Sequence, residues 1–376
     1  MAGIYLHIPF CKKRCIYCDF FSTTRKEQKT AYIRALCHEL TDRKNYLKGE
    51  PIETIYLGGG TPSQLAKEDF EAIFSHIYKV YKVTPNAEIT LEANPDDLTS
   101  EYISMLRTFP FNRISMGIQT FQDSTLKLLQ RRHTAEQAIR AFQNCRTAGF
   151  RNISIDLMYG LPGETLASWK EDLKQALALH PEHISAYHLI YEEGTTLWQL
   201  REQHKLEEAD EDLSVSLFGT LIDSLTAAGY EHYEISNFCL PGFHSRHNSS
   251  YWTEKKYLGC GPSAHSYNGT SRQWNVASLN EYIRGISNGN PTFEVEELDL
   301  YTRYNDFVIT HIRTQWGMPL PKLGKQYGEE LYKYCLHMAT PHLQQGTLEI
   351  KNDTLKLTRK GIFISDGIMS DMLWVE

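Results

Sequence analysis

Short apolar, β-branched runs alternate with longer segments of helical period through about the first 230 residues. The apolar runs predict six strands, at Ile4–Ile8, Thr54–Leu57, Glu88–Glu92, Arg113–Gly117, Asn152–Met158 and His183–Leu189. The helical period predicts helices at 27–47, 64–81, 99–107, 124–148, 166–179 and 208–228. Strand–helix alternation implies parallel strands, in a doubly wound sheet or an α/β barrel, and periodicity alone does not choose between the two.

The pattern changes after about residue 230. The segment 231–290 is rich in Gly, Ser, His, Asn, Tyr and Trp without a clear period, and it predicts long ordered loops around a site. The pattern then becomes helical and ends in two short alternating segments around Asn352 and Asp353, which predict a hairpin. We therefore expect three units: an α/β unit at 1–230, a loop-rich segment at 231–290 and a carboxy-terminal helical domain with a hairpin at 291–376.

Residues that could bind a ligand or take part in a reaction follow the predicted strands. In parallel α/β folds the ligand site lies at the carboxyl ends of the strands, so side chains at these positions are expected to converge. The first strand leads into a cysteine-containing loop, and the others lead into or carry Gly58–Pro62, Glu92–Pro95, Gln119 and Asp156.

Three cysteines in the first of these loops carry the strongest signal. Cys11, Cys15 and Cys18 have CxxxCxxC spacing, and the next cysteine is Cys37. Thiolates are the standard ligands of iron–sulfur clusters, and three of them leave one iron of a four-iron cubane open to a further ligand. Structural zinc normally needs a fourth ligand, which no second cysteine or histidine pair supplies. No signal-peptide pattern precedes the loop, so a cytoplasmic, reduced location is expected and disulfides are disfavoured.

Composition limits the classes of function. The 376 residues, 41% of them hydrophobic, are enough for a large core. A formal charge of −7 without a long basic run argues against nucleic-acid binding. No apolar stretch approaches the roughly 20 residues that span a bilayer, so membrane contact is expected to be peripheral at most. Monomer and homodimer both stay open.

Several of the residues that follow the predicted strands could have a purely structural role instead of a functional one. Three glycines at 58–60 are a tight turn unless a ligand approaches their backbone. An isolated Glu92 is usually solvated, but it suits an ammonium or a ribose. Arg131 sits beside Arg132 on the predicted 124–148 helix, where a solvated charge is normal, and Asp156 suits a ligand or a structural network equally well.

The cysteine spacing together with Gly58-Gly59-Gly60-Thr61-Pro62 resembles the radical S-adenosylmethionine (SAM) superfamily. The resemblance implies an incomplete parallel (β/α)6 barrel, a [4Fe-4S] cluster on Cys11, Cys15 and Cys18, and SAM on the open iron. The order Tyr5-x-His7-Ile8-Pro9-Phe10-Cys11, Gly117-Ile118-Gln119 and Asp156 to Gly163 is similar to the oxygen-independent coproporphyrinogen III oxidase family. The family implies two SAM molecules. The first would contact Tyr5, Gly59 and Glu92, and the second would contact Tyr17, Gly60, Thr61, Gln119, Arg131 and Asp156.

Two departures separate the chain from the oxidase itself. The oxidase pattern continues to CxxxCxxCxC, whereas Phe20 stands at the last of these positions here. The oxidase also has an amino-terminal extension before the strand that begins here at residue 4. In both respects the chain resembles the HemW-type haem chaperones, a branch of the same family.

A third feature favours the chaperone branch. His247-Asn248-Ser249-Ser250-Tyr251-Trp252 is similar to the HNxxYW element that this branch associates with haem binding. A histidine can supply an axial donor and aromatic rings can supply flat walls, and one helical turn would place His247 and Tyr251 on the same face. The ordinary reading is a histidine bonded to a neighbour, with Trp252 in the core. His244 and His265 are alternative iron ligands, and the remaining cysteines are expected to pack as small apolar groups.

The resemblance thus implies a cytoplasmic haem chaperone with a [4Fe-4S] cluster, SAM and haem. It would deliver haem to acceptor haemoproteins such as respiratory enzymes. The alternative is a catalytic radical SAM oxidoreductase acting on coproporphyrinogen III or another tetrapyrrole.

Overall fold

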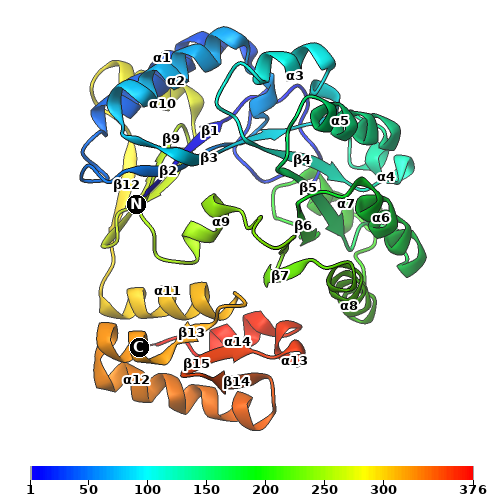
Figure 1. Ribbon diagram of the computed structural model, residues 1–376, viewed down its shortest axis with the longest axis vertical. Helices are drawn as coiled ribbons and strands as arrows, with labels where there is room; N and C mark the ends of the chain where they lie inside the picture. The colour runs from blue at the N-terminus through cyan, green and yellow to red at the C-terminus, as the bar shows by residue number, and fades with distance from the viewer. Residues whose placement is uncertain (1, 376) are drawn as a thin grey trace.

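A curved sheet of twelve strands dominates the computed structural model, which describes residues 2–375 (Figure 1). Six strands pair in parallel in chain order. They are β1 (Ala2–Ile8), β2 (Ile52–Gly59), β3 (Val83–Ala93), β4 (Arg113–Gln119), β5 (Ile153–Tyr159) and β6 (His183–His188). All six are predicted strands, and the predicted incomplete (β/α)6 barrel is confirmed.

Helices cover the outer face of this sheet. Predicted helices are found as α1 (Lys29–Asp42), α2 (Lys67–Val80), α3 (Ser100–Leu106), α6 (Leu166–Leu179) and α8 (Glu211–Ala227), while α7 (Thr196–Glu202) was not expected. Short 3-10 turns η1 (Lys26–Gln28), η2 (Pro62–Gln64) and η3 (Pro95–Asp97) lie between them. Along β1, Ile4, Leu6 and Ile8 are fully buried, so the alternate residues Tyr5 and His7 point to the barrel interior.

The prediction of a single helix at 124–148 is wrong. The chain forms α4 (Asp123–Leu128) and α5 (Ala135–Thr147), separated by a connection in which Gln130 has φ 59°. Thr134 caps α5 by accepting a hydrogen bond from the Gln137 backbone N–H. Arg131 and Arg132 therefore lie in a loop rather than on a solvated helix face.

The expectation of long loops at 231–290 is also wrong. This segment forms β7 (Glu231–Glu234), β8 (Asn237–Cys239), α9 (Arg246–Tyr251), β9 (Tyr257–Cys260), β10 (His265–Tyr267), β11 (Ser271–Asn275) and α10 (Leu279–Ser287). β9 pairs in parallel with β1, and β8 pairs antiparallel with β6, so the segment extends both ends of the sheet. Its strands of three to five residues are too short for an alternating pattern to show.

The last strand of the large sheet is β12 (Phe293–Glu297), which pairs with β11. A separate core then begins at Tyr304 in a mainly helical unit below the sheet (Figure 1). The unit comprises α11 (Leu300–Ile312), β13 (Met318–Pro319), α12 (Leu320–Gln344), β14 (Leu348–Lys351), β15 (Thr354–Leu357), α13 (Arg359–Ile362) and α14 (Ser365–Asp371). The predicted hairpin is β14–β15, with Asn352 and Asp353 both at positive φ, as a type I′ turn requires.

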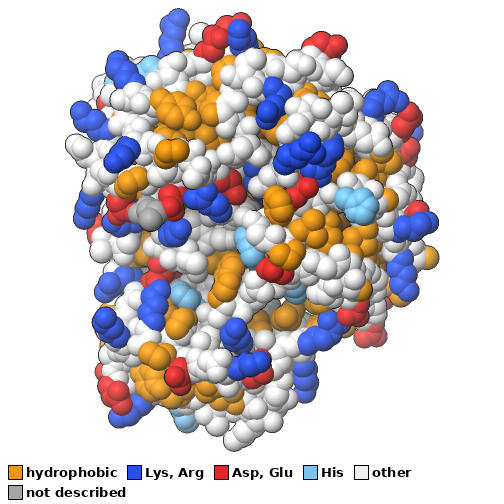
Figure 2. Space-filling view, in the orientation of Figure 1, with side chains coloured by type: hydrophobic (Ala, Val, Ile, Leu, Met, Phe, Trp, Pro, Cys, Tyr) orange, Lys and Arg blue, Asp and Glu red, His pale blue; other side chains and the backbone are white. Residues whose placement is uncertain are grey.

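Among residues 2–375, every helix is too short or too polar to cross a bilayer. On the face drawn in Figure 2, basic and acidic side chains are interspersed over the surface.

Candidate functional site

A cavity of about 510 Å³ opens at the carboxyl ends of the parallel strands. It brings together the three cysteines and all but one of the residues that the resemblance assigns to SAM. Those lining it are Cys11, Cys15, Cys18, Tyr17, Gly59, Gly60, Thr61, Glu92, Gln119, Arg131 and Asp156. Tyr5, the exception, lines a neighbouring cavity.

Asp97 holds the cysteine loop in place. This buried carboxylate accepts hydrogen bonds from Lys12 Nζ at 2.7 Å, Ser63 Oγ at 2.9 Å and Arg132 Nη2 at 3.1 Å. Lys12 lies in the cysteine loop and Ser63 follows the glycine turn, so a single carboxylate joins two parts of the cavity rim. A buried carboxylate with charged donors is the kind of group that fixes a loop.

The cysteine sulfurs have polar partners on the cavity wall. Thr61 Oγ1 donates to Cys11 Sγ at 3.2 Å, and Arg131 Nη1 donates to Cys15 Sγ at 3.5 Å. Burial raises the pKa of Cys18 to about 11, so binding of iron at this sulfur must displace a proton. Three thiols on one wall, with a buried guanidinium beside them, fit a negatively charged cluster held by three cysteines.

The glycine turn packs closely against β1. Gly59 has φ 101°, and a Cβ there would lie 2.6 Å from the His7 ring. A Cβ on Gly60 would lie 2.8 Å from the carbonyl oxygen of Ile8, to which Gly60 N–H donates at 2.8 Å. Only glycine allows this approach, which joins the end of β2 to the start of the cysteine loop.

Two carboxylates face the same cavity. Glu92 accepts from Tyr56 Oη at 2.7 Å and from Gly59 N–H at 3.1 Å. Burial raises the pKa of Glu92 to about 7, despite the hydrogen bond from Tyr56. Burial also raises the pKa of Asp156 to about 6, and Ser115 Oγ donates to Asp156 at 3.3 Å. Two desolvated carboxylates are suited to a cationic ligand that would restore their ionised form.

Arg131 and Gln119 occupy constrained positions at the rim. Arg131 Nη2 donates to Asn94 Oδ1 at 2.7 Å and to the Gly117 carbonyl oxygen at 2.6 Å, while its Nε is buried without a protein partner among residues 2–375. Gln119 has φ 74°, in the left-handed region that is costly for a residue with a side chain. Such strain at the end of a strand is characteristic of functional sites.

Sequence reasoning did not assign several lining residues to this cavity, among them Tyr56, Ser115, Asn94 and Asn248. Tyr56 and Ser115 each lie two residues before a rim glycine, so strand alternation places them on the same inner face and was a usable signal. Asn94 directly follows β3 and was identified only as part of the rim. Asn248 reaches the cavity because α9 packs inside the barrel, which no local pattern indicates.

A second cavity, of about 430 Å³, adjoins the first. Its walls include the rings of Tyr5, Phe20, Phe21, Tyr251 and Tyr257. Phe20 is 60% exposed and lines both cavities, as does Asp19, so the two cavities share part of their wall. The structure thus places an aromatic pocket beside the cysteine cavity.

His247 and Tyr251 share one face of α9, as predicted. Nε2 of His247 and Oη of Tyr251 are 2.9 Å apart, and Nδ1 of His247 lies 2.8 Å from Thr54 Oγ1. His247 is fully buried, and burial lowers its pKa to about 3. Both ring nitrogens therefore have protein partners, as in the ordinary reading of this histidine, and its contact with haem stays a prediction.

The other histidines and Trp252 differ in their surroundings. His265 is exposed, lines the second cavity and stacks on Trp274 with ring centres 5.8 Å apart. His244 pairs with Glu231 at 2.9 Å. Trp252 is half-buried outside both cores, with the Arg313 guanidinium 4.2 Å from its ring centre.

Glu88 of β3 anchors the start of α9, which lies on the concave side of the sheet (Figure 1). Its carboxylate accepts from the backbone N–H groups of Arg246 and His247, each at 3.0 Å. Glu88→Ala leaves these donors unpaired, and we expect α9 to lose about 1–3 kcal/mol of local stability. Hydrogen exchange at residues 246–251 should quicken, while the exposed Glu329→Ala serves as control. Unchanged protection in Glu88→Ala would contradict the anchoring role.

Comparison with known proteins supports the reading of the cavity. The chain matches the radical SAM superfamily over residues 5–176 and the HemN C-terminal domain over residues 298–364. Haem chaperone HemW of Bacillus subtilis (strain 168) is 32% identical over 99% of both chains. Haem chaperone HemW of Escherichia coli (strain K12) is 36% identical over 70% of this chain and 69% of that protein.

The solved structure of coproporphyrinogen III oxidase (HemN) from Escherichia coli, a radical SAM enzyme, matches the fold. Its TM-score is 0.86 at 24% identity, over 99% of this chain and 89% of that chain. The identity with HemW proteins extends over nearly the full length on both sides, across the barrel and the carboxy-terminal unit. The chain therefore belongs to the HemW family, a branch of the radical SAM superfamily.

Proposed function

We propose that the protein is a cytoplasmic haem chaperone, which binds haem and delivers it to acceptor haemoproteins such as respiratory enzymes. The observation that carries this proposal is the aromatic second cavity directly beside the cysteine cavity. Flat apolar rings suit the face of a porphyrin, and Tyr251 of the HNSSYW element is one of them. The names of the HemW relatives agree with it.

We propose that the first cavity holds a [4Fe-4S] cluster and SAM. Cys11, Cys15 and Cys18 would hold the cluster, which when bound supplies an electron to SAM. Glu92 and Asp156 offer acceptors for the amino group and the ribose, and Arg131 places a positive charge beside Cys15. The carboxylates, once ionised, also balance the positive charge of a sulfonium.

We propose that haem lies in the second cavity with His265 as its accessible axial donor. Residues 246–252 would contribute Tyr251 to the wall. His247 would bind iron only after one of its ring nitrogens had lost its hydrogen bond to Thr54 or Tyr251, and Trp252 does not line this cavity. The imidazole of His265 is exposed and already lines this cavity, so this side chain needs no such rearrangement.

Haem titration of cluster-loaded, anaerobic protein tests this assignment. We expect His265→Ala to shift the Soret band and to weaken binding at least about tenfold, or about 1.4 kcal/mol. His247→Ala should have the smaller effect, and His38→Ala, on the exposed face of α1, should have none.

The opposite ranking, with His247→Ala alone losing haem, would assign the axial position to α9. Absence of haem binding by the unmodified protein would reject the chaperone proposal. Conversion of coproporphyrinogen III to protoporphyrinogen in the presence of SAM and reductant would contradict chaperoning as the sole function.

A further inference from the structure

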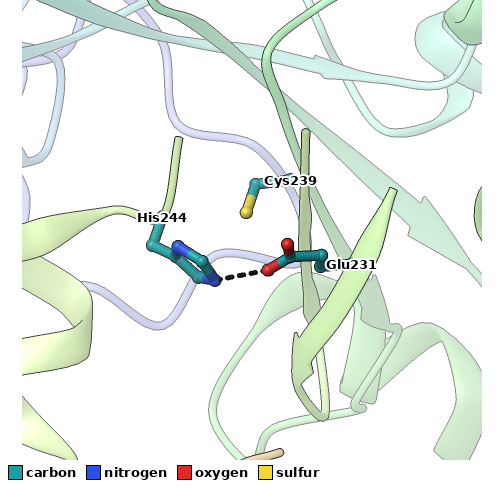
Figure 3. Close-up of side chains that lie close together, drawn as sticks. All are labelled: Glu231, Cys239 and His244. Atoms are coloured by element: carbon teal, nitrogen blue, oxygen red, sulfur yellow. Dashed lines mark ion pairs between the residues drawn. The ribbon is translucent and has the colours of Figure 1, made fainter. Parts of the chain in front are cut away.

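Three metal-binding side chains converge outside both cavities. Nε2 or Nδ1 of His244, Sγ of Cys239 and a carboxylate oxygen of Glu231 all lie within 4.8 Å of one another. Figure 3 shows the three side chains directed toward a common point, with the cysteine sulfur facing the His244–Glu231 pair. No other group of three such side chains is as close within residues 2–375.

Strand pairing builds two corners of this cluster. Glu231 and Cys239 are register partners in the antiparallel pair β7–β8, so their side chains lie on the same face. The chain then turns through Gly242, at φ 86°, with Phe243 N–H bonded to the Leu240 carbonyl oxygen at 3.0 Å. This turn returns His244 to the same face. The path of the backbone therefore brings the three donor side chains close together.

Aromatic rings hold the His244 imidazole in position. Its ring centre lies 4.8 Å from that of Tyr233 in an edge-to-face contact and 5.6 Å from that of Trp316. Nε2 of His244 is 2.9 Å from Glu231 and 3.5 Å from the side-chain amide of Gln315, which is also 3.5 Å from Glu231. Gln315 thus stands next to the same pair and can turn an amide oxygen toward it.

The donor set is chemically specific. A thiolate, an imidazole and a carboxylate are three of the ligand types that bind Zn²⁺ in tetrahedral geometry. The contact between His244 and Glu231 explains two of the three side chains, but not a buried cysteine sulfur within 4.8 Å of both.

We propose that Glu231, Cys239 and His244 bind a zinc-type divalent cation. The Gln315 amide nitrogen lies 3.5 Å from both Glu231 and His244, and this side chain, once turned, offers its amide oxygen as a fourth donor. His244 and Glu231 are partly exposed, so the ion enters from solvent, while Cys239 forms the buried floor. Binding displaces the thiol proton to solvent and involves no change of oxidation state.

The position of the site gives it a structural consequence. His244 lies three residues before His247, and Gln315 belongs to the carboxy-terminal unit, whose Gln315 N–H donates to the Tyr233 carbonyl oxygen at 3.0 Å. A bound ion therefore ties the segment entering α9 to both β7–β8 and the carboxy-terminal unit. It acts as a cross-link of three elements that the chain otherwise joins through hydrogen bonds and packing.

Metal analysis of tag-free, cluster-loaded protein tests the proposal. After exposure to micromolar Zn²⁺ and buffer exchange, we expect one zinc per chain in addition to the cluster iron. Cys239→Ala and His244→Ala should each weaken zinc binding by more than about 100-fold. Loss of a hydrogen-bond partner of a metal ligand already costs about 10- to 100-fold, and these substitutions remove the ligand itself. Cys145→Ala, which removes another buried cysteine, should retain the zinc.

Thermal unfolding provides a second readout, because a ligand of the native state stabilises it by mass action. Zn²⁺ should raise the Tm of the unmodified protein and leave that of His244→Ala unchanged. Zinc content unaffected by both substitutions, or no uptake by the unmodified protein, would overturn the proposal. Iron content, measured in the same samples, reports separately on the cluster.

Discussion

Cys15→Ala is expected to abolish the visible absorption of the reconstituted cluster. Two thiolates remain in this variant, and they leave two irons of a cubane without protein ligands. Cys15 also accepts the hydrogen bond from Arg131 Nη1, so the substitution leaves a buried guanidinium without its sulfur partner. Iron and sulfide content, with the absorption spectrum, measure the loss after anaerobic reconstitution.

Cys37→Ala is the matched control for this experiment. Cys37 is buried in α1 and lies outside both cavities, so its loss should leave the cluster spectrum unchanged. A full cluster spectrum in Cys15→Ala would refute the ligand assignment. Loss of the cluster in Cys37→Ala as well would instead point to a general folding defect, which circular dichroism separates from loss of a ligand.

SAM binding is expected to strengthen as pH rises through neutrality. The pKa of Glu92 is raised to about 7, so its carboxyl is mostly neutral at about pH 6 and mostly ionised at about pH 8. Because only the ionised form attracts the cationic ligand, SAM affinity should increase roughly tenfold over this range. Equilibrium binding to cluster-loaded protein measures it. Glu92→Gln should bind weakly throughout and lose this part of the pH dependence.

The Asp156→Asn variant distinguishes the contribution of Asp156 to SAM binding from that of Glu92. Asp156 has a pKa raised to about 6, so its contribution to binding should fall at lower pH than that of Glu92. The variant should therefore keep the rise around pH 7. A pH profile that is the same for Glu92→Gln and the unmodified protein would show that Glu92 does not contact SAM.

Glu92 also has a predictable effect on stability. Its native pKa of about 7 exceeds the ordinary value of 4.5, so the native state binds more protons than the unfolded state between these two pKa values. The contribution of Glu92 to the free energy of unfolding is therefore greatest below the unfolded pKa and is lost as pH rises through the native pKa. In the absence of ligand, ionised Glu92 destabilises the site that it serves.

Several predicted site residues line one cavity for a local reason. Cys11, Gly59, Glu92 and Gln119 follow or end strands of the parallel sheet, and parallel pairing brings these ends to one rim. The order of strands and loops along the chain was therefore enough to predict that these side chains lie at one rim.

The features of the site that local patterns did not indicate have tertiary causes. Arg131 was expected on a helix face, but the chain breaks at Gln130 and turns the guanidinium into the cavity. Tyr5 lies on the inner face of β1, yet it opens to the second cavity because β9 extends the sheet on that side. The imidazole of His247 is hydrogen-bonded to Thr54, which is 193 positions away in the chain. No local pattern contains such information.

The shared wall formed by Phe20 has a thermodynamic consequence. Phe20 lines both cavities, so a ligand that moves this side chain from one cavity also changes the wall of the other. The two occupancies are then linked, and linkage is reciprocal: the factor by which one ligand changes the affinity of the second equals the factor in the opposite direction.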